Sequence, residues 1–142
     1  MATFKDRENN EWELTLTYGS ASAVKGATGV NLAAVSKSAD WVDLLFSDPE
    51  NLVKVLWVMV ADQAEKKGVT AERFGYGFDG PALERAGAAL GEAIADFFPR
   101  SRIAKAIREG LPKVLAAADE KAVKEIEKAL LTASSSVSNS PA

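Results

Sequence analysis

A run of alternating apolar and polar residues near the amino terminus gives the clearest strand pattern in the chain. Every second residue from Trp12 to Tyr18 is apolar, which is the period of a β-strand with one buried face. The polar turn over residues 7–10 separates this run from Phe4, so we expect residues 3–5 to form the partner strand of a hairpin. Because a two-stranded hairpin is only marginally stable in water, we expect it to pack against helices.

The rest of the chain shows the three- to four-residue period of amphipathic helices. Residues that commonly begin a helix precede the periodic segments: Ser38, Ser47 or Asp48, Thr70, Asp79 and Asp119. Residues that commonly end a helix follow several of them: Gly29, Gly68 and Pro99. The pattern predicts an α+β fold that is mainly α, with an amino-terminal β-hairpin followed by about five to six helices.

The helix that begins near residue 48 has the best-marked start in the sequence. Ser47 and Glu50 have the spacing of a capping box, whereas Asp48 followed by Pro49 would cap the helix with proline in its first turn. Both alternatives lead to a helix that ends at Gly68 after two lysines. Its middle is apolar on nearly every side, which predicts a central buried helix.

Both the hairpin and the helices supply expected core residues: Trp12, Leu16, Leu56, Trp57, Met59 and Leu90. The helix after Asp79 contains four small residues close together: Gly87, Ala88, Ala89 and Gly91. Small side chains let a neighbouring element approach closely, either inside the core or at a seam between two copies of the chain. We favour packing inside the core.

In the carboxyl-terminal region we expect Gly110 and Pro112 to interrupt one helix and Asp119 to start another. This last helix carries an apolar stripe made of Ala122, Val123, Ile126, Ala129 and Leu130, opposite Glu120, Lys124, Glu127 and Lys128. The Ser-rich end that follows contains few residues able to form a core. We therefore expect one domain over residues 1–133 and a disordered tail over residues 134–142.

The absence of cysteine and histidine removes the commonest catalytic and metal-binding arrangements. The 142 residues contain no usual zinc ligands, no cysteine nucleophile and no serine–histidine–aspartate triad. Asp40 with Asp43, and Glu92 with Asp96, have a spacing that could serve acid–base chemistry or bind magnesium, but such pairs are common on solvated helix faces. We therefore expect no enzyme activity, no bound metal and no cofactor.

The segment over residues 74–81 interleaves glycines with three aromatic side chains, Phe74, Tyr76 and Phe78. Its glycines do not match the spacing of a phosphate-binding loop, and no expected strand precedes them. The aromatic rings could stack on a ligand or pin the loop to the core. We favour the second alternative.

Charge is distributed unevenly along the chain. Residues 1–98 carry a net charge of −6, and residues 99–142 a net charge of +3. Four cations form a candidate partner-binding surface: Arg100, Arg102, Lys105 and Arg108. This surface suits an acidic face on a protein or on another copy of the chain, with a solvated helix face as the alternative. Only four cations cluster and the isoelectric point is near 5.1, so we expect no binding to nucleic acid.

The longest apolar stretch, residues 55–61, is too short to span a membrane, and the first ten residues are charged where a secretion signal would be apolar. These features predict a cytoplasmic protein that does not bind membranes.

Three segments carry a resemblance to a known family: FKDRENNEWELTL, TGVNLAAV and DPENLVKVLWVMVADQAEKKGVTAERFGYGFDGPALERAGAALGEAIADFFP. In this order they resemble the small tail assembly chaperones of long-tailed bacteriophages, over residues 3–110. The resemblance implies a protein of the host bacterial cytoplasm that binds the tape measure protein, assists assembly of the tail tube protein and is absent from the mature virion. The alternatives are a structural or adaptor protein of the virion and a small cytoplasmic enzyme, and self-association stays open.

Overall fold

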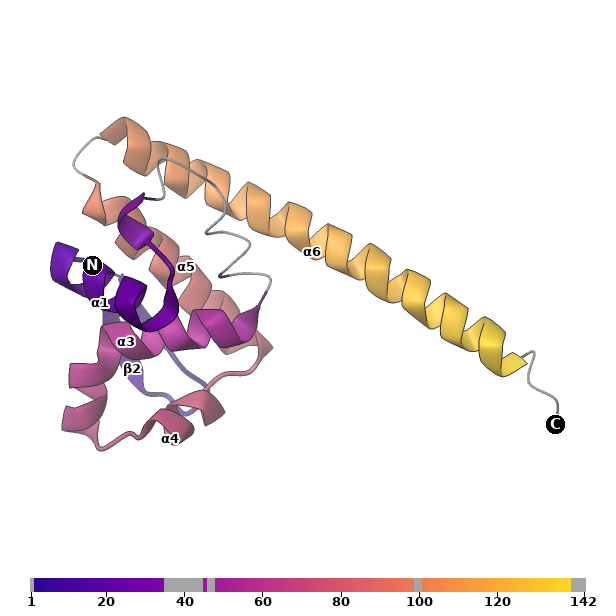
Figure 1. Cartoon of the computed structure of the whole chain (residues 1–142), viewed down its shortest axis with the longest axis horizontal. Helices are drawn as coiled ribbons and strands as arrows, with labels where there is room; N and C mark the ends of the chain where they lie inside the picture. Colours follow the sequence, from indigo (N-terminus) through magenta and orange to yellow (C-terminus); the bar gives the residue numbers. More distant parts are fainter. Residues whose placement is uncertain (1, 35–44, 46–47, 99–100, 139–142) are drawn as a thin grey trace. The chain divides into compact units, whose positions relative to one another are not determined.

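The computed structural model describes residues 2–34, 45, 48–98 and 101–138 (Figure 1). Its elements in chain order are β1 (Ala2–Lys5), β2 (Glu11–Leu14), α1 (Tyr18–Thr28), the short 3-10 helix η1 (Leu32–Ala34), α3 (Pro49–Lys67), α4 (Ala71–Tyr76), α5 (Gly80–Phe97) and α6 (Ser101–Ser138). A hairpin followed by helices confirms the expected α+β, mainly α fold class. The helix expected after Ser38 lies outside the described residues, apart from Leu45.

The chain divides into two units, Met1–Leu111 and Pro112–Ala142, which we describe separately. The first unit contains the hairpin and the helices up to the first three turns of α6. The second contains the remainder of α6. Helix α6 contributes residues to both units and stays helical as far as Ser138. The expected domain over residues 1–133 stays a prediction.

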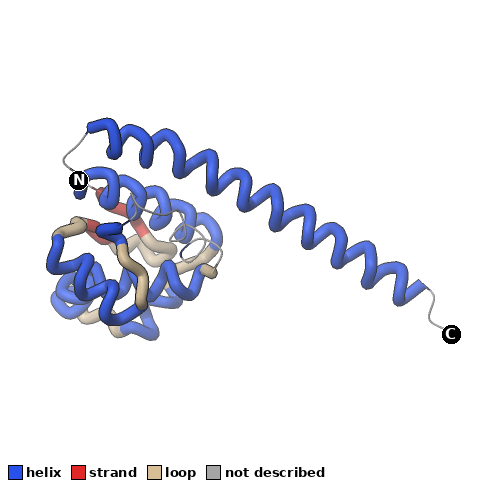
Figure 2. Tube along the Cα trace, turned by 45° about the horizontal axis from the view of Figure 1, so that its top comes forward, coloured by secondary structure: helices blue, strands red, loops and turns tan. Residues whose placement is uncertain are grey.

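The two strands, red in Figure 2, form an antiparallel hairpin. Within it Phe4 pairs with Trp12 and Ala2 with Leu14. All four side chains are buried, because this register places the apolar residues of both strands on one face. β1 packs against α5, and β2 packs mainly against α3. The hairpin therefore contacts two helices that come much later in the sequence.

The second strand is shorter than its alternating pattern indicated. Leu16 is buried as expected, but Tyr18 begins α1 and is 80% exposed, so its placement on the buried strand face was wrong. Thr17 and Ser20 form a reciprocal cap, in which the Ser20 backbone N–H donates to Thr17 Oγ1 at 3.1 Å and the Thr17 N–H donates to Ser20 Oγ at 2.8 Å. This cap starts the helix before the alternation ends.

The long helix α3 begins with the aspartate cap rather than with a Ser47–Glu50 capping box. The Glu50 backbone N–H donates to Asp48 Oδ1 at 3.0 Å, with Pro49 in the first turn, while Ser47 lies outside the described residues. The helix ends as expected at Gly68, whose φ of +69° favours glycine. α3 packs against α1, β2, α4 and α5, as expected of a central helix.

The six expected core residues are in or next to the core. Trp12, Leu16, Leu56 and Leu90 are buried, and the partly buried Trp57 and Met59 pack against them. Three of the four small residues in α5 are also buried: Gly87, Ala89 and Gly91. This burial within the chain favours their interpretation as packing residues.

Gly91 accommodates a side chain from the start of α6. A methyl group added at Gly91 would lie 2.6 Å from Cδ2 of Leu111, far inside van der Waals contact. Leu111 is itself buried, so it fills the notch that Gly91 leaves on α5. The glycine thus fixes how closely these two residues of the first unit approach each other.

The helix α6 contains both residues that we expected to interrupt it. Gly110 and Pro112 lie within Ser101–Ser138, so the expected break and the expected start at Asp119 were wrong. Proline removes one backbone donor and crowds the preceding turn, but alanine, leucine, lysine and glutamate are abundant on both sides and favour helix strongly. The tail expected over residues 134–142 is helical to Ser138, and the rest lies outside the described residues. No helix in the described part of the chain has both the length and the apolar character needed to cross a membrane.

Candidate functional site

The four cations proposed as a partner-binding surface have different environments. Arg102 and Lys105 are exposed on α6, and Lys105 Nζ lies 4.0 Å from Glu109 Oε1. Arg108 Nε contacts Glu92 Oε2 at 3.1 Å, and its guanidinium also binds Asp96, so this arginine joins α6 to α5 within the first unit. Arg100 lies outside the described residues. The structure therefore assigns an intrachain contact to Arg108, and the role of the segment in partner binding stays a prediction.

The acid pairs considered for catalysis or metal binding do not form a larger cluster. Glu92 and Asp96 share Arg108, and Asp40 and Asp43 lie outside the described residues. Among the residues that the structure describes, no group of three or more acidic, cysteine or histidine side chains could hold a metal ion. The Glu92–Asp96 pair is thus part of an exposed ion-pair network.

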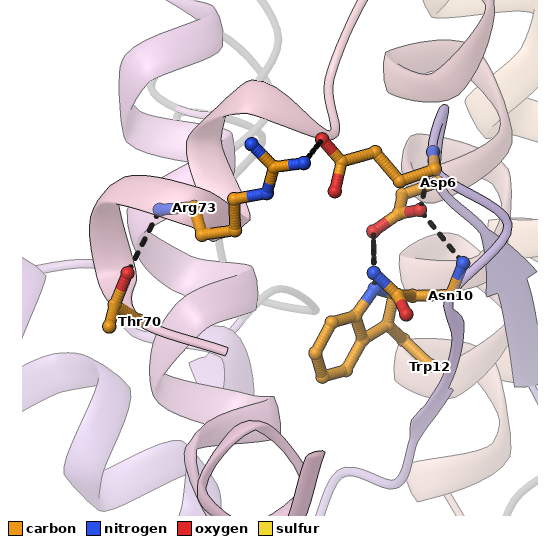
Figure 3. Close-up of polar contacts among 6 residues, drawn as sticks. Asp6, Asn10, Trp12, Thr70 and Arg73 are labelled. Carbon is orange, nitrogen blue, oxygen red and sulfur yellow. Dashed lines mark hydrogen bonds and ion pairs between the residues drawn. The ribbon is translucent and has the colours of Figure 1, made fainter. Parts of the chain in front are cut away.

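A buried carboxylate that sequence analysis missed lies at the hairpin turn. Asp6 is only 3% exposed and accepts hydrogen bonds from the backbone N–H groups of Glu8 and Asn10 at 2.9 and 3.0 Å. Its other oxygen accepts the indole Nε1–H of the buried Trp12 at 2.9 Å (Figure 3). These bonds hold the turn and orient the largest side chain of the core, so we assign Asp6 a structural role. An aspartate followed by polar turn residues was the available sequence signal.

The aromatic segment after α3 is pinned to the core, as expected for two of its three rings. Phe74 packs edge-on against Trp12 at a centroid distance of 5.1 Å, and Phe78 packs against Phe74 at 5.0 Å. Gly77 lies against Asp6, where a Cβ would come within 2.8 Å of the carboxylate. The third ring, Tyr76, is exposed. Packing against the core therefore accounts for Phe74, Phe78 and Gly77 of this segment.

A small apolar hollow of about 280 Å³ lies beside Trp57. It is lined by residues of α1, α3 and α4, including Val53, Val58 and Phe74. A second, open groove of about 540 Å³ is lined by all four residues of β1 and by residues of α5, including Arg85 and Glu92. We assign no chemistry to either hollow.

Exposed aliphatic side chains of the described residues concentrate on the second unit. Among large apolar or aromatic side chains that the structure describes as exposed, only Tyr18 and Tyr76 lie outside α6. Val123, Ile126 and Leu130 are 51%, 58% and 64% exposed. Together with the exposed Ala122 and Ala129 they form what we call the α6 stripe: Ala122, Val123, Ile126, Ala129 and Leu130. Sequence periodicity predicted this stripe, and the structure shows that its described side chains are open to water.

The charges around the α6 stripe are arranged by the helical period. Residues three and four apart are neighbours on a helix, so Glu120 and Glu127 border the stripe next to Val123, and Glu125 borders its other side next to Ala122 and Ala129. Our expectation that Glu120 and Glu127 lie opposite the stripe was therefore wrong. The far face carries three exposed lysines instead: Lys121, Lys124 and Lys128.

Comparisons with protein-family models, with curated proteins and with solved structures found no match to this chain. The functional assignment therefore depends on the residues themselves. The α6 stripe places aliphatic side chains in water at a spacing that suits contact with another helix.

Proposed function

We propose that this chain is a bacteriophage tail assembly chaperone that binds the tape measure protein and assists assembly of the tail tube. The single observation that carries the proposal is the exposed α6 stripe. The resemblance of residues 3–110 to such chaperones supplies the identity of the partner. The same proposal gives the protein a cytoplasmic role during assembly and no place in the mature virion.

The physical demands of that role agree with a helix that carries an open apolar face. A tape measure protein is long and helical, and its apolar stripes contact water until the tube surrounds them. A second amphipathic helix can cover such a stripe by packing side chains at intervals of three and four residues. The α6 stripe offers this spacing through Val123, Ile126 and Leu130. Binding of this kind needs complementary surfaces and no catalytic group.

Modest affinity at each site suits a chaperone that must later leave. Many copies bound along one tape measure protein would cover it collectively, and each copy could be displaced singly as tube subunits add. A few aliphatic contacts per copy are compatible with such reversible binding.

Co-expression with a tape measure protein from the same phage genome tests the proposal. We expect the wild-type chain to keep the tape measure protein in the soluble fraction and to co-purify with it. Leu130→Ser removes an aliphatic side chain from the stripe and should reduce co-purification. Leu131→Ser is a matched control, because Leu131 is 70% exposed on the same helix but lies outside the stripe.

Two results would overturn the proposal. One is a wild-type chain that neither solubilises nor co-purifies with the tape measure protein. The other is an equal effect of Leu130→Ser and Leu131→Ser, which would assign binding to a different surface. Mass spectrometry of purified virions separates the chaperone from a structural or adaptor protein, because only the latter remains in the particle at stoichiometric amounts.

A further inference from the structure

The borders of the α6 stripe carry charge of one sign. Glu120 and Glu127 flank one side and Glu125 flanks the other, whereas the nearest lysines of this helix lie on its far face. All three glutamates are exposed. A helix that packs on the stripe would therefore bring its own flanking residues next to carboxylates.

We propose that the α6 stripe selects an amphipathic helix whose apolar seam is flanked by lysine or arginine. The inference deepens the proposed function and rests on it for the assignment of the stripe as the binding surface. It specifies the partner by chemistry, namely a helix with aliphatic residues along one face and cations on both borders of that face.

Charge complementarity across helix pairs supports this selection. Residues that flank an apolar seam approach the flanking residues of the partner helix, and opposite charges there determine which helices pair. Glu125 and Glu127 take part in no ion pair among the described residues. Glu120 Oε1 lies 3.6 Å from Lys124 Nζ, but both side chains are more than 70% exposed. Such an exposed pair contributes little to stability, so a cation of the partner can replace Lys124 at small cost.

The same borders disfavour a second copy of this chain on the stripe. Both sides of the stripe are acidic, so two stripes packed together would set carboxylates beside carboxylates whether the helices run parallel or antiparallel. No lysine of residues 120–131 lies next to the stripe to offset this repulsion. The cation-flanked partner is therefore favoured over self-association at this surface.

Two synthetic helical peptides provide the probe. Both carry the same leucine and isoleucine seam over four heptads, and their flanking positions are all lysine in one peptide and all glutamate in the other. Binding to the full chain is measured by fluorescence anisotropy at low salt. We expect the lysine-flanked peptide to bind more tightly by about tenfold or more, and the difference to shrink at about 0.5 M salt because screening weakens exposed charge pairs.

Charge-reversed variants of the chain assign the selectivity to the borders. The triple variant Glu120→Lys, Glu125→Lys and Glu127→Lys should reverse the preference between the peptides. A matched control reverses the far face, through Lys121→Glu, Lys124→Glu and Lys128→Glu, and should retain it. Circular dichroism verifies that both variants keep their helix content. Ile126→Ser should weaken binding of the lysine-flanked peptide without removing the border charges.

Equal binding of the two peptides, no binding of either, or an equal effect of border and far-face reversals would overturn the inference. A wild-type dimer in sedimentation that Ile126→Ser dissociates would also overturn it, because a second copy would then occupy the stripe. The outcome is separable from the proposed function. If the tape measure protein co-purifies but the two peptides bind equally, only the inference about flanking charge is wrong. If the peptides are discriminated but the tape measure protein does not co-purify, the phage assignment is wrong.

Discussion

The carboxylate of Asp6 illustrates how one side chain connects a turn to the core. It binds two backbone N–H groups of its own turn and the indole of Trp12, and Gly77 of the aromatic segment packs against it. The Arg7 backbone N–H also donates to the Gly77 carbonyl oxygen at 2.7 Å. The turn is therefore held from within the hairpin and from a segment about seventy residues later in the chain.

Replacing Asp6 with alanine should destabilise the protein measurably. The substitution leaves the buried Trp12 indole N–H without its acceptor, and we expect the free energy of unfolding to fall by about 1–3 kcal/mol in a denaturant titration. Asp6→Asn keeps one oxygen acceptor, so we expect it to lower the free energy of unfolding by less than Asp6→Ala. Glu8→Ala is the control, because Glu8 makes a partly exposed ion pair with Arg73 and should cost only about 0–1 kcal/mol. Equal losses for Asp6→Ala and Glu8→Ala would contradict this assignment.

Individual caps show what local sequence can and cannot determine. Thr70 and Asp79 cap α4 and α5 as predicted, since each side-chain oxygen accepts a backbone N–H three residues later. Tyr18 was misplaced because the competing Thr17–Ser20 cap depends on where the strand stops pairing. The burial of Asp6 was unpredictable for the same kind of reason, because it requires Trp12 and Gly77 to be brought together by the fold.

The helices were predicted best where both ends carried strong signals. α3 has an aspartate cap, an early proline and a left-handed glycine, and its bounds agree with the sequence pattern. The continuity of α6 was not predicted, because glycine and proline were given more weight than the helix-favouring residues around them. The approach of Leu111 to Gly91 joins two helices, and periodicity within one helix holds no information about such a contact.

Gly91→Ala tests whether the notch on α5 is needed. The new methyl group would lie 2.6 Å from Leu111 Cδ2, and we expect the free energy of unfolding to fall by about 1–3 kcal/mol despite the better helix propensity of alanine. In a Leu111→Ala background the obstructing methyl is absent, so the same substitution should be neutral or stabilising. A double-mutant cycle, with the stability of each variant measured by thermal melting, gives the coupling free energy between Gly91 and Leu111.

Gly26→Ala in α1 is the matched control for the substitution at Gly91. Apart from the adjoining helix backbone, no atom of the described residues lies within 4 Å of its added methyl group, so we expect stabilisation of about 0.5–1 kcal/mol. If Gly91→Ala stabilised the wild-type background to the same extent, Leu111 would have moved aside at no cost and the notch would have no structural role.

Over the whole chain, the exposed part of the basic segment remains available to a partner. Arg102 and Lys105 are exposed, and neither takes part in the Arg108 ion pairs that join α6 to α5. Charge and helical period along the sequence predict both this segment and the α6 stripe. They do not separate Arg108 from the other cations, because that distinction depends on which acids of α5 face it.

Reversing Arg102 and Lys105 to glutamate tests the contribution of this segment to partner binding. We expect a folded protein that co-purifies less tape measure protein, with a defect that depends on salt because the lost attraction is electrostatic. The control variant Lys25→Glu with Lys66→Glu makes the same change in net charge at exposed positions of α1 and α3. Wild-type co-purification at low ionic strength would identify Arg102 and Lys105 as solvated surface residues.

The contact between β1 and α5 also has a consequence while the chain is being made. Arg85 Nε donates to the Lys5 carbonyl oxygen at 3.0 Å, and the two residues are 80 positions apart. At about 5–20 residues per second, a ribosome needs roughly 4–16 s to add the intervening segment. Throughout that interval Phe4 of β1 lacks α5, the helix that later packs against this strand. A protein proposed to cover the apolar surface of another chain therefore exposes apolar side chains of its own hairpin to water until α5 has been made.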